Sequence, residues 1–210
     1  MKKTLFFIFL LCSIFTLAQK QIYSSPNLSE KIRTQKTVAI LPFTTTITYK
    51  KTPKKYDAEA NHDQELKMAK NIQSSMYTFL LRKADKYSVS FQDVDQTNIL
   101  LKKAGVEDQL DGMTKDEIAK VLNVDAVISG KFDQIQSRSE AGAIVTTVLF
   151  GGLGSKTGSG TLTMTINSGD NGELLWRFMK TMDDTITIST DQLVESMMRK
   201  VSRNFPYTKS

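Results

Sequence analysis

Residues 151–160, GGLGSKTGSG, combine glycines with a lysine and a threonine in the manner of a phosphate-binding loop. In such a loop a glycine directly precedes the Lys-Ser/Thr pair, so that backbone N–H groups and the lysine converge on one phosphate, and a helix follows. Here Ser155 separates Gly154 from Lys156, and an alternating, strand-like pattern follows at 161–166. The spacing therefore excludes a nucleotide site.

The stretch before this loop is apolar and carries no charge over the 14 residues 141–154. It is shorter than the ~20 residues of a membrane-spanning helix. It is long enough for a barrel strand of ~9–11 residues, but residues 144–150 do not alternate between apolar and polar. Two hypotheses stay open: packing on this domain or on a second copy of the chain, and peripheral contact with a membrane. The residues assigned to this contact are Val148, Phe150, Gly151, Gly152 and Gly154.

Four lysines and two tyrosines gather within eight residues: Tyr49, Lys50, Lys51, Lys54, Lys55 and Tyr56. One interpretation is a solvated loop. The other is a docking surface for an anionic polymer or for an acidic face of an envelope protein.

Other residues with catalytic or metal-binding chemistry are isolated. His62, with Asp63 and Glu65 nearby, is the sole histidine, and Asp93 and Asp95 have no third ligand or nucleophile beside them. The sequence therefore predicts a protein that is not an enzyme, with no catalytic, cofactor-binding or metal-binding residues.

The N-terminus has the pattern of a secretory signal peptide over residues 1–18: Lys2 and Lys3, then an apolar run, then small residues, with cleavage expected near Ala18. Leu11 precedes Cys12 where a lipid-attachment site requires a small residue. Cleavage would remove this sole cysteine and leave a mildly basic chain of net charge +4 (+6 less the two lysines). An exported chain without a basic helix is not expected to bind nucleic acid.

Hydrophobic periodicity predicts an α/β (α+β) domain with a single mixed β-sheet packed with helices. The order β-α-β-α-α-β-β-β-α follows a polar lead-in at 19–36, and a long polar connection separates the first strand from the first helix. The expected strands are 37–43, 88–92, 124–136 and the hairpin 161–179, and the expected helices are 65–83, 96–104, 114–122 and one beginning near 189.

Local signals refine this outline. Thr114 and Glu117 have the spacing of a capping box, which predicts a helix start at Thr114. Leu174, Trp176 and Phe178 are expected on one face of the hairpin's second strand. In the last helix the predicted apolar stripe is Leu193, Val194, Met197, Met198 and Val201.

Three blocks of sequence carry a family resemblance: TVAILPF at 37–43, EIAKVLNVDAVISGKF at 117–132, and GDNGELLWRF at 169–178. They resemble an envelope superfamily that includes the curli-secretion channel protein CsgG, the penicillin-binding-protein activator LpoB and the amino-terminal domain of TolB. Small exported members also end in a helix followed by FPY, here Phe205-Pro206-Tyr207. The resemblance covers one domain at 37–207.

The resemblance implies a non-enzymatic binding or assembly component of the bacterial cell envelope that acts through protein–protein contacts, in the periplasm or at the outer membrane. The alternative it implies is a membrane-associated homo-oligomer like the curli channel. Lipid-anchored members carry an acylated cysteine at the mature N-terminus, and this chain has none there.

Overall fold

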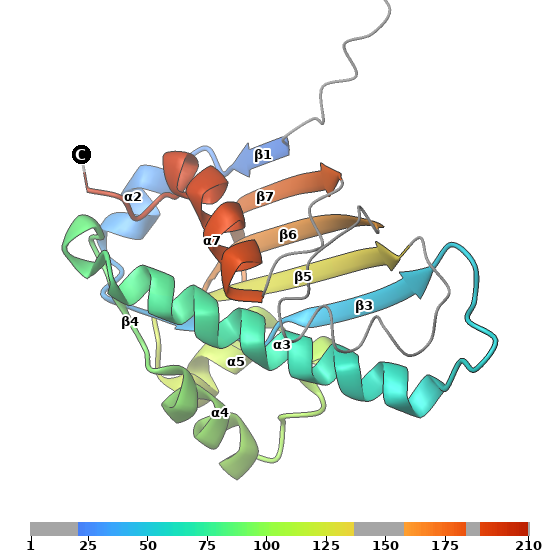
Figure 1. Ribbon diagram of the computed structural model, residues 1–210. Helices are drawn as coiled ribbons and strands as arrows, with labels where there is room; N and C mark the ends of the chain where they lie inside the picture. Colours follow the sequence, from blue (N-terminus) through green and yellow to red (C-terminus); the bar gives the residue numbers. More distant parts are fainter. Residues whose placement is uncertain (1–20, 137–157, 184–189, 210) are drawn as a thin grey trace, which may run out of the picture.

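The computed structural model describes residues 21–136, 158–183 and 190–209. Within these residues the chain forms one mixed sheet of seven strands packed with five α-helices (Figure 1). The predicted fold class is confirmed, and the predicted order of elements is confirmed except for three additional elements near the N-terminus.

The sheet has the strand order β1-β7-β6-β5-β2-β4, and β3 pairs with β5 beside β2. Strands β2, β3 and β4 lie in the parallel part, whereas β5, β6, β7 and β1 are joined by antiparallel pairs. The bounds are β1 Gln21–Ser24, β2 Thr37–Ile40, β3 Thr44–Tyr49, β4 Ser90–Phe91, β5 Ala126–Gln136, β6 Gly158–Ser168 and β7 Leu174–Asp183.

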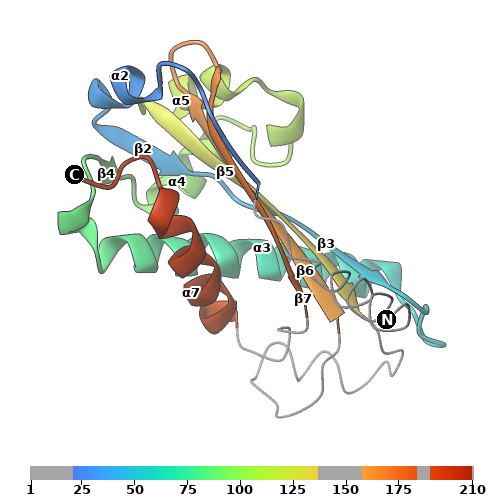
Figure 2. The ribbon, with the colours of Figure 1, turned by 90° about the horizontal axis from the view of Figure 1, so that it is seen from above.

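The helices cover the two faces of the sheet unequally (Figure 2). Helices α3 and α7 pack on one face over most of its length and form the larger core, whereas α4 and α5 cover only the part of the other face formed by β2 and the start of β5. The bounds are α2 Leu28–Arg33, α3 Ala58–Leu81, α4 Val94–Lys103, α5 Lys115–Leu122 and α7 Thr190–Val201.

Strands β2 and β3 run end to end along the same edge of β5. Val38 pairs with Ala126 and Thr44 with Lys131, so β2 and β3 together hold one residue more than the matching part of β5. The extra residue is accommodated at Leu41-Pro42-Phe43, where proline cannot donate to the ladder. The Phe43 ring lies over Gly130, where an added Cβ would come within 2.0 Å of the ring. Gly130 of the VISGKF block is thus required because a side chain at this position would collide with the ring of Phe43 in the LPF block.

The residues from 44 to 64 were predicted to form a long polar connection, and this prediction was wrong. Thr44–Tyr49 form β3, and α3 begins at Ala58 rather than at 65. Thr45 and Ile47 are buried, so the segment does alternate, but one of its two buried positions is a threonine, which leaves Ile47 as the single apolar residue in the buried row. Asp57 caps α3 by accepting hydrogen bonds from the backbone of Glu59 and Ala60.

The sequence analysis assigned no strand or helix to residues 19–36, but β1 and α2 lie there. Gln21 pairs with Met179 and Ser24 with Trp176, so β1 adds an edge strand to the sheet. All four residues of β1 are exposed, which explains why no burial pattern marks it in the sequence.

The predicted hairpin is confirmed as β6 and β7, but one core position differs. Trp176 and Phe178 are buried as expected, whereas Leu174 is only partly buried and Leu175 is completely buried. The register shifts between Ile166 and Asn167, and this irregularity turns Leu175 into the core despite its odd position in the alternation.

The predictions for the shorter helices are confirmed. Thr114 and Glu117 form the capping box at the start of α5, and Asn123 ends that helix in the left-handed conformation with φ of 54°. In α7 the described members of the apolar stripe, Val194, Met197 and Met198 among them, are buried.

The C-terminal FPY segment closes the core beside the start of β5. The Phe205 ring contacts the rings of Tyr87, Phe91, Trp176 and Tyr207 at centroid distances of 5.6, 6.4, 6.0 and 5.7 Å. We call this the aromatic end of the sheet. The opposite end, where Tyr49, Gln136, Gly158 and Asp183 lie, is called the lysine end below.

Candidate functional site

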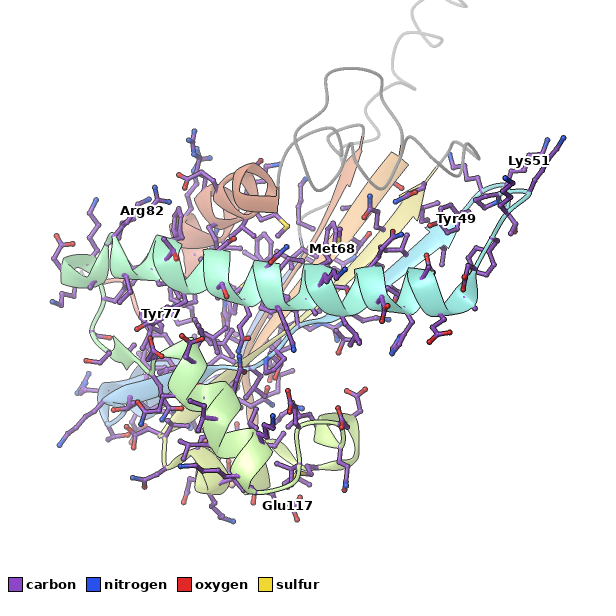
Figure 3. The ribbon with its side chains drawn as sticks, turned by 60° about the horizontal axis from the view of Figure 1, so that its bottom comes forward. Tyr49, Lys51, Met68, Tyr77, Arg82 and Glu117 are labelled. Carbon is purple, nitrogen blue, oxygen red and sulfur yellow. The ribbon has the colours of Figure 1, made fainter. Side chains whose placement is uncertain are left out.

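The predicted lysine cluster forms the connection between β3 and α3 at the lysine end. Tyr49 is the last residue of β3, and Lys50, Lys51, Lys54 and Lys55 follow in the connection, all of them exposed. Figure 3 shows Lys51 at the far tip of this connection, directed away from the sheet. None of the four lysines forms an ion pair with a described residue. The structure therefore brings these positive charges together and leaves them open to solvent.

The connection is held in place at its base. The Lys50 N–H donates to the Gln136 carbonyl at 2.8 Å, and the Tyr56 N–H donates to the Pro53 carbonyl at 3.2 Å. Pro53 is buried although its neighbours are exposed. The rings of Tyr49 and Tyr56 meet edge to face at 5.9 Å. The lysines thus extend from an anchored turn.

A polar network beneath the connection fixes β3 to α3. The Tyr49 hydroxyl donates to Asn61 Oδ1 at 3.0 Å, and the Asn61 side-chain Nδ2 donates to Glu65 Oε1 at 3.2 Å. The same Oε1 accepts the Ile47 N–H at 2.8 Å. Burial, together with the nearby Tyr56 and Glu65, raises the pKa of Tyr49, so this hydroxyl stays protonated and keeps its donor role.

Several chain segments leave the sheet at this same end (Figure 1). Gln136, the last residue of β5, pairs with Tyr49 on one side and with Gly158, the first residue of β6, on the other. Ser159 pairs with Asp183, the last residue of β7. Gln136 and Gly158, the described residues that flank 137–157 in the sequence, therefore pair with each other beside the lysine connection.

Val148, Phe150, Gly151, Gly152 and Gly154 lie outside the described residues, as does the predicted signal peptide. Gly158 begins β6, so the residues after the GSKT quartet form a strand, as the sequence analysis expected. This start is incompatible with the helix that a phosphate-binding loop requires.

Two buried glutamines at the lysine end were not predicted. Gln134 and Gln136 are 1% and 4% exposed, on the face of the sheet that α3 covers. Both amide atoms of Gln134 and the amide oxygen of Gln136 have no hydrogen-bond partner among the described residues. An unpaired buried amide is unfavourable by about 1–3 kcal/mol. The QIQ spacing in the sequence carries this signal, since both residues fall on the core side of the strand.

The other residues with metal-binding or acid–base chemistry are either exposed on a helix or used to cap one. His62 lies in the first turns of α3 and is exposed, with Nδ1 3.7 Å from Glu65. Asp93 caps α4 by accepting hydrogen bonds from the backbone N–H groups of Asp95 and Gln96. No cluster of metal-ligating side chains occurs in the part of the chain that the structure describes.

The chain matches no protein-family model and no curated protein sequence. Among solved structures it is similar to the PelC dodecamer from Paraburkholderia phytofirmans, with 13% identity, a TM-score of 0.43, and coverage of 91% of this chain and 99% of that one. It is also similar to lipoprotein GNA1162 from Neisseria meningitidis, with 10% identity, a TM-score of 0.45, and coverage of 80% and 99%.

The LpoB C-terminal domain from Salmonella enterica is a further similar structure, with 13% identity, a TM-score of 0.36, and coverage of 75% of this chain and 93% of that one. LpoB belongs to the superfamily that the sequence resembles. At these identities and TM-scores the similarities assign neither a family nor a function.

Among the described residues, no helix combines the length and the apolar character needed to cross a membrane.

Proposed function

We propose that this chain is an exported, non-enzymatic binding component of the cell envelope and that the lysine end is its contact surface. The observation that carries the proposal is the convergence at one end of the sheet. The anchored lysine connection lies there beside Gln136 and Gly158, the described residues on either side of 137–157, a range whose sequence includes the uncharged apolar stretch 141–154. A basic surface beside an apolar segment is the composition of a contact surface, not of an ordinary solvated loop.

The positive charge of this surface indicates the chemical class of the partner. Lys50, Lys51, Lys54 and Lys55 have no described acidic neighbour to neutralise them. The partner is therefore an acidic face of an envelope protein or an anionic envelope polymer. The Tyr49–Tyr56 pair and the buried Pro53 reduce the entropy lost when the connection is ordered in a complex.

The placement of polar side chains supports a non-enzymatic role. Asp57 and Asp93 cap helices, Asp125 accepts two backbone N–H groups, and Glu65 joins β3 to α3. These four carboxylates therefore have structural roles.

A second candidate is a membrane-associated oligomer in which the same end meets lipid. The observation that favours it is the uncharged stretch 141–154, which falls in the sequence between Gln136 and Gly158, the paired residues beside the lysine connection. Lysines next to an apolar insertion bind anionic head groups with about 1 kcal/mol per charge. Val148 and Phe150 would then contact lipid or a second copy of the chain.

A quadruple substitution of Lys50, Lys51, Lys54 and Lys55 by glutamine tests the basic surface. We expect at least a tenfold loss of salt-sensitive binding to polyglutamate, measured by fluorescence anisotropy. The matched control replaces four exposed lysines elsewhere, Lys86, Lys102, Lys103 and Lys200, with the same change in net charge. Equal losses in both variants would show a non-specific charge effect and would refute the proposal.

The second test separates the two candidates. Co-sedimentation with phosphatidylglycerol vesicles, and solution mass with and without detergent, are measured for the native chain and for the Val148→Asp, Phe150→Asp double variant. A soluble monomer that does not co-sediment with the vesicles supports the binding component. A detergent-dependent ring that the double variant disassembles supports the membrane-associated oligomer.

A further inference from the structure

A groove of about 760 Å³ opens between α3, the connection from α4 to α5 and the sheet. Its volume lies in the range of ligand-binding clefts. Its floor contains Phe43 and Gly130, at the position where the chain passes from β2 to β3, and Ser129 lies beside them. Figure 3 shows the two walls, with α3 crossing the view and the α4–α5 unit, marked by Glu117, below it. The groove begins at the carboxyl end of the parallel strand β2, a usual place for ligand sites in α/β sheets.

Apolar side chains line the two walls. Leu66 on α3 is 49% exposed although it is a large aliphatic residue, and it shares a helix face with His62 and Lys70, one turn before and after it. Leu110 lines the opposite wall. A single exposed leucine is ordinary. Here, however, Leu66 borders a hollow that also holds Phe43 and Leu110, so an apolar side chain placed there would be enclosed.

The wall formed by the α4–α5 connection is acidic. Glu107, Asp108 and Asp111 line the groove, are exposed, and form no ion pair with a described residue. This differs from carboxylates nearby on the surface: Asp116 pairs with Lys120 at 2.9 Å, and Glu173 with Lys31. Positive charge also lines the groove at Lys70, Lys115 and Lys131, and of these Lys131 is paired with Asp133 at 3.2 Å. Three carboxylates that form no ion pair with a described residue therefore line the same groove as Leu66.

The floor offers unused hydrogen-bonding capacity. The Ser129 hydroxyl is buried and has no partner among the described residues. Thr163 and Thr165 of β6 lie beside it, and Lys70 and Lys115 stand at the sides. Hydroxyl and ammonium groups of this kind can bond the carbonyl and N–H groups of an extended backbone. A buried hydroxyl without a partner at the floor of a cleft shows that the polar groups of this floor are not all satisfied by the described residues.

We propose that this groove binds an extended segment of a partner polypeptide in which an arginine or lysine stands next to a large aliphatic residue. The aliphatic side chain lies between Leu66 and Leu110. The cation faces Asp108 and Asp111. The peptide backbone bonds to the partly exposed Thr163 and Thr165 on the floor, beside Ser129. None of these residues belongs to the lysine end, so the groove and the basic surface are separate binding sites on one chain.

The probe is the peptide acetyl-Gly-Leu-Arg-Leu-Gly-amide, titrated into the ¹⁵N-labelled protein and followed by amide chemical shifts. We expect saturable shifts at Leu66, Leu110, Asp111 and Ser129 with a dissociation constant of about 1 mM or below, the affinity of a few good contacts. The matched peptide with glutamate in place of arginine should bind at least tenfold more weakly. Shifts that do not saturate, or equal binding of the glutamate peptide, would overturn the proposal.

Helix α3 supplies its own control. Leu66→Ser should weaken binding of the arginine peptide at least fivefold, because the aliphatic contact is lost. Leu81→Ser removes a leucine of equal exposure, 48%, from the same helix but outside the groove, and it should leave binding unchanged. The Asp108→Asn, Asp111→Asn double variant should weaken binding and reduce its salt dependence. If Leu81→Ser weakens binding as much as Leu66→Ser, the peptide binds elsewhere and the proposal fails.

Discussion

The two ends of the sheet are built from different side chains, although the same strands run through both. At the aromatic end the helix-facing surface holds Trp176, Phe178 and Phe205, each at most 3% exposed. At the lysine end the same surface of β5 holds Gln134 and Gln136, equally buried, and β6 holds Gly160 opposite Gln134. One end is an ordinary apolar core. The other is buried but polar.

This difference separates stability from function. Packed rings stabilise the folded state through their burial and their edge-to-face geometry. Buried amides without hydrogen-bond partners destabilise the folded state. Unfavourable local choices of this kind are expected at sites that serve binding. The lysine end combines the unpaired amides and the exposed lysines with Gln136 and Gly158, the residues that flank 137–157, so the comparison supports the proposal that contacts are made there.

The largest expected effect comes from breaking the aromatic end. Phe205→Ala removes a side chain that contacts four rings and is 3% exposed. We expect a loss of about 3–5 kcal/mol in the free energy of unfolding, measured by urea denaturation. Tyr23→Ala is the control, because Tyr23 is 47% exposed and the change should stay within about 0.5 kcal/mol. Similar losses in both variants would contradict a core concentrated at the aromatic end.

A smaller effect of opposite sign is expected at the lysine end. Gln134→Leu replaces an unpaired buried amide with an apolar group of similar size and should raise the free energy of unfolding by about 1 kcal/mol. Gln73→Leu is the matched control. Gln73 is also 1% exposed, but its amide donates to the Ile40 carbonyl at 2.8 Å and exchanges hydrogen bonds with Asn98.

Removing the Gln73 amide should therefore lower stability by about 1–2 kcal/mol, because it leaves its partners unsatisfied. The sign of the change distinguishes the two glutamines, whereas a general preference for apolar side chains would stabilise both variants. If Gln134→Leu destabilises the protein, the Gln134 amide has a stabilising partner in the free protein, and the contrast with Gln73 fails.

The aromatic end was the more predictable from the sequence. Trp176, Phe178 and the α7 stripe follow simple alternation or helical spacing, and Thr114 with Glu117 is a purely local signal. Strand β3 was missed because Thr44 to Tyr49 are polar by composition, although β-branched, and β1 was missed because none of its residues is buried. A strand whose identity depends on pairing with a distant partner leaves no hydrophobic pattern to read.

The candidate site was predictable only in its parts. Composition marked the lysines, but their neighbours in space depend on the pairing of Tyr49 with Gln136 and of Gln136 with Gly158, contacts between residues far apart in the chain. The groove was not predicted at all. Its walls come from three separate segments, and Leu66 in isolation looks like any other leucine of an amphipathic helix.

The smallest expected effect concerns the junction of α3 with α7. Arg82 at the end of α3 donates to Glu195 on α7, and this bond, with a weaker contribution from Arg199, holds the pKa of Glu195 below its usual value. A folded-state pKa below the unfolded one adds stability that is present above the unfolded-state pKa of about 4.3 and is lost as pH falls through the folded-state value. Because Arg82 is mostly exposed, screening limits the contribution to less than about 1 kcal/mol.

Arg82→Met should therefore lower the free energy of unfolding slightly at pH 7, and the difference from the native chain should shrink as the pH falls below about 4. The variant also loses the contact of the Arg82 guanidinium with the Phe79 ring, but that loss does not depend on pH and adds a constant. Glu195→Gln removes the titrating group, so in that background Arg82→Met should show only the constant part. A difference that persists unchanged at pH 2.5 in the native background would mean that ring packing, not the ion pair, joins α3 to α7.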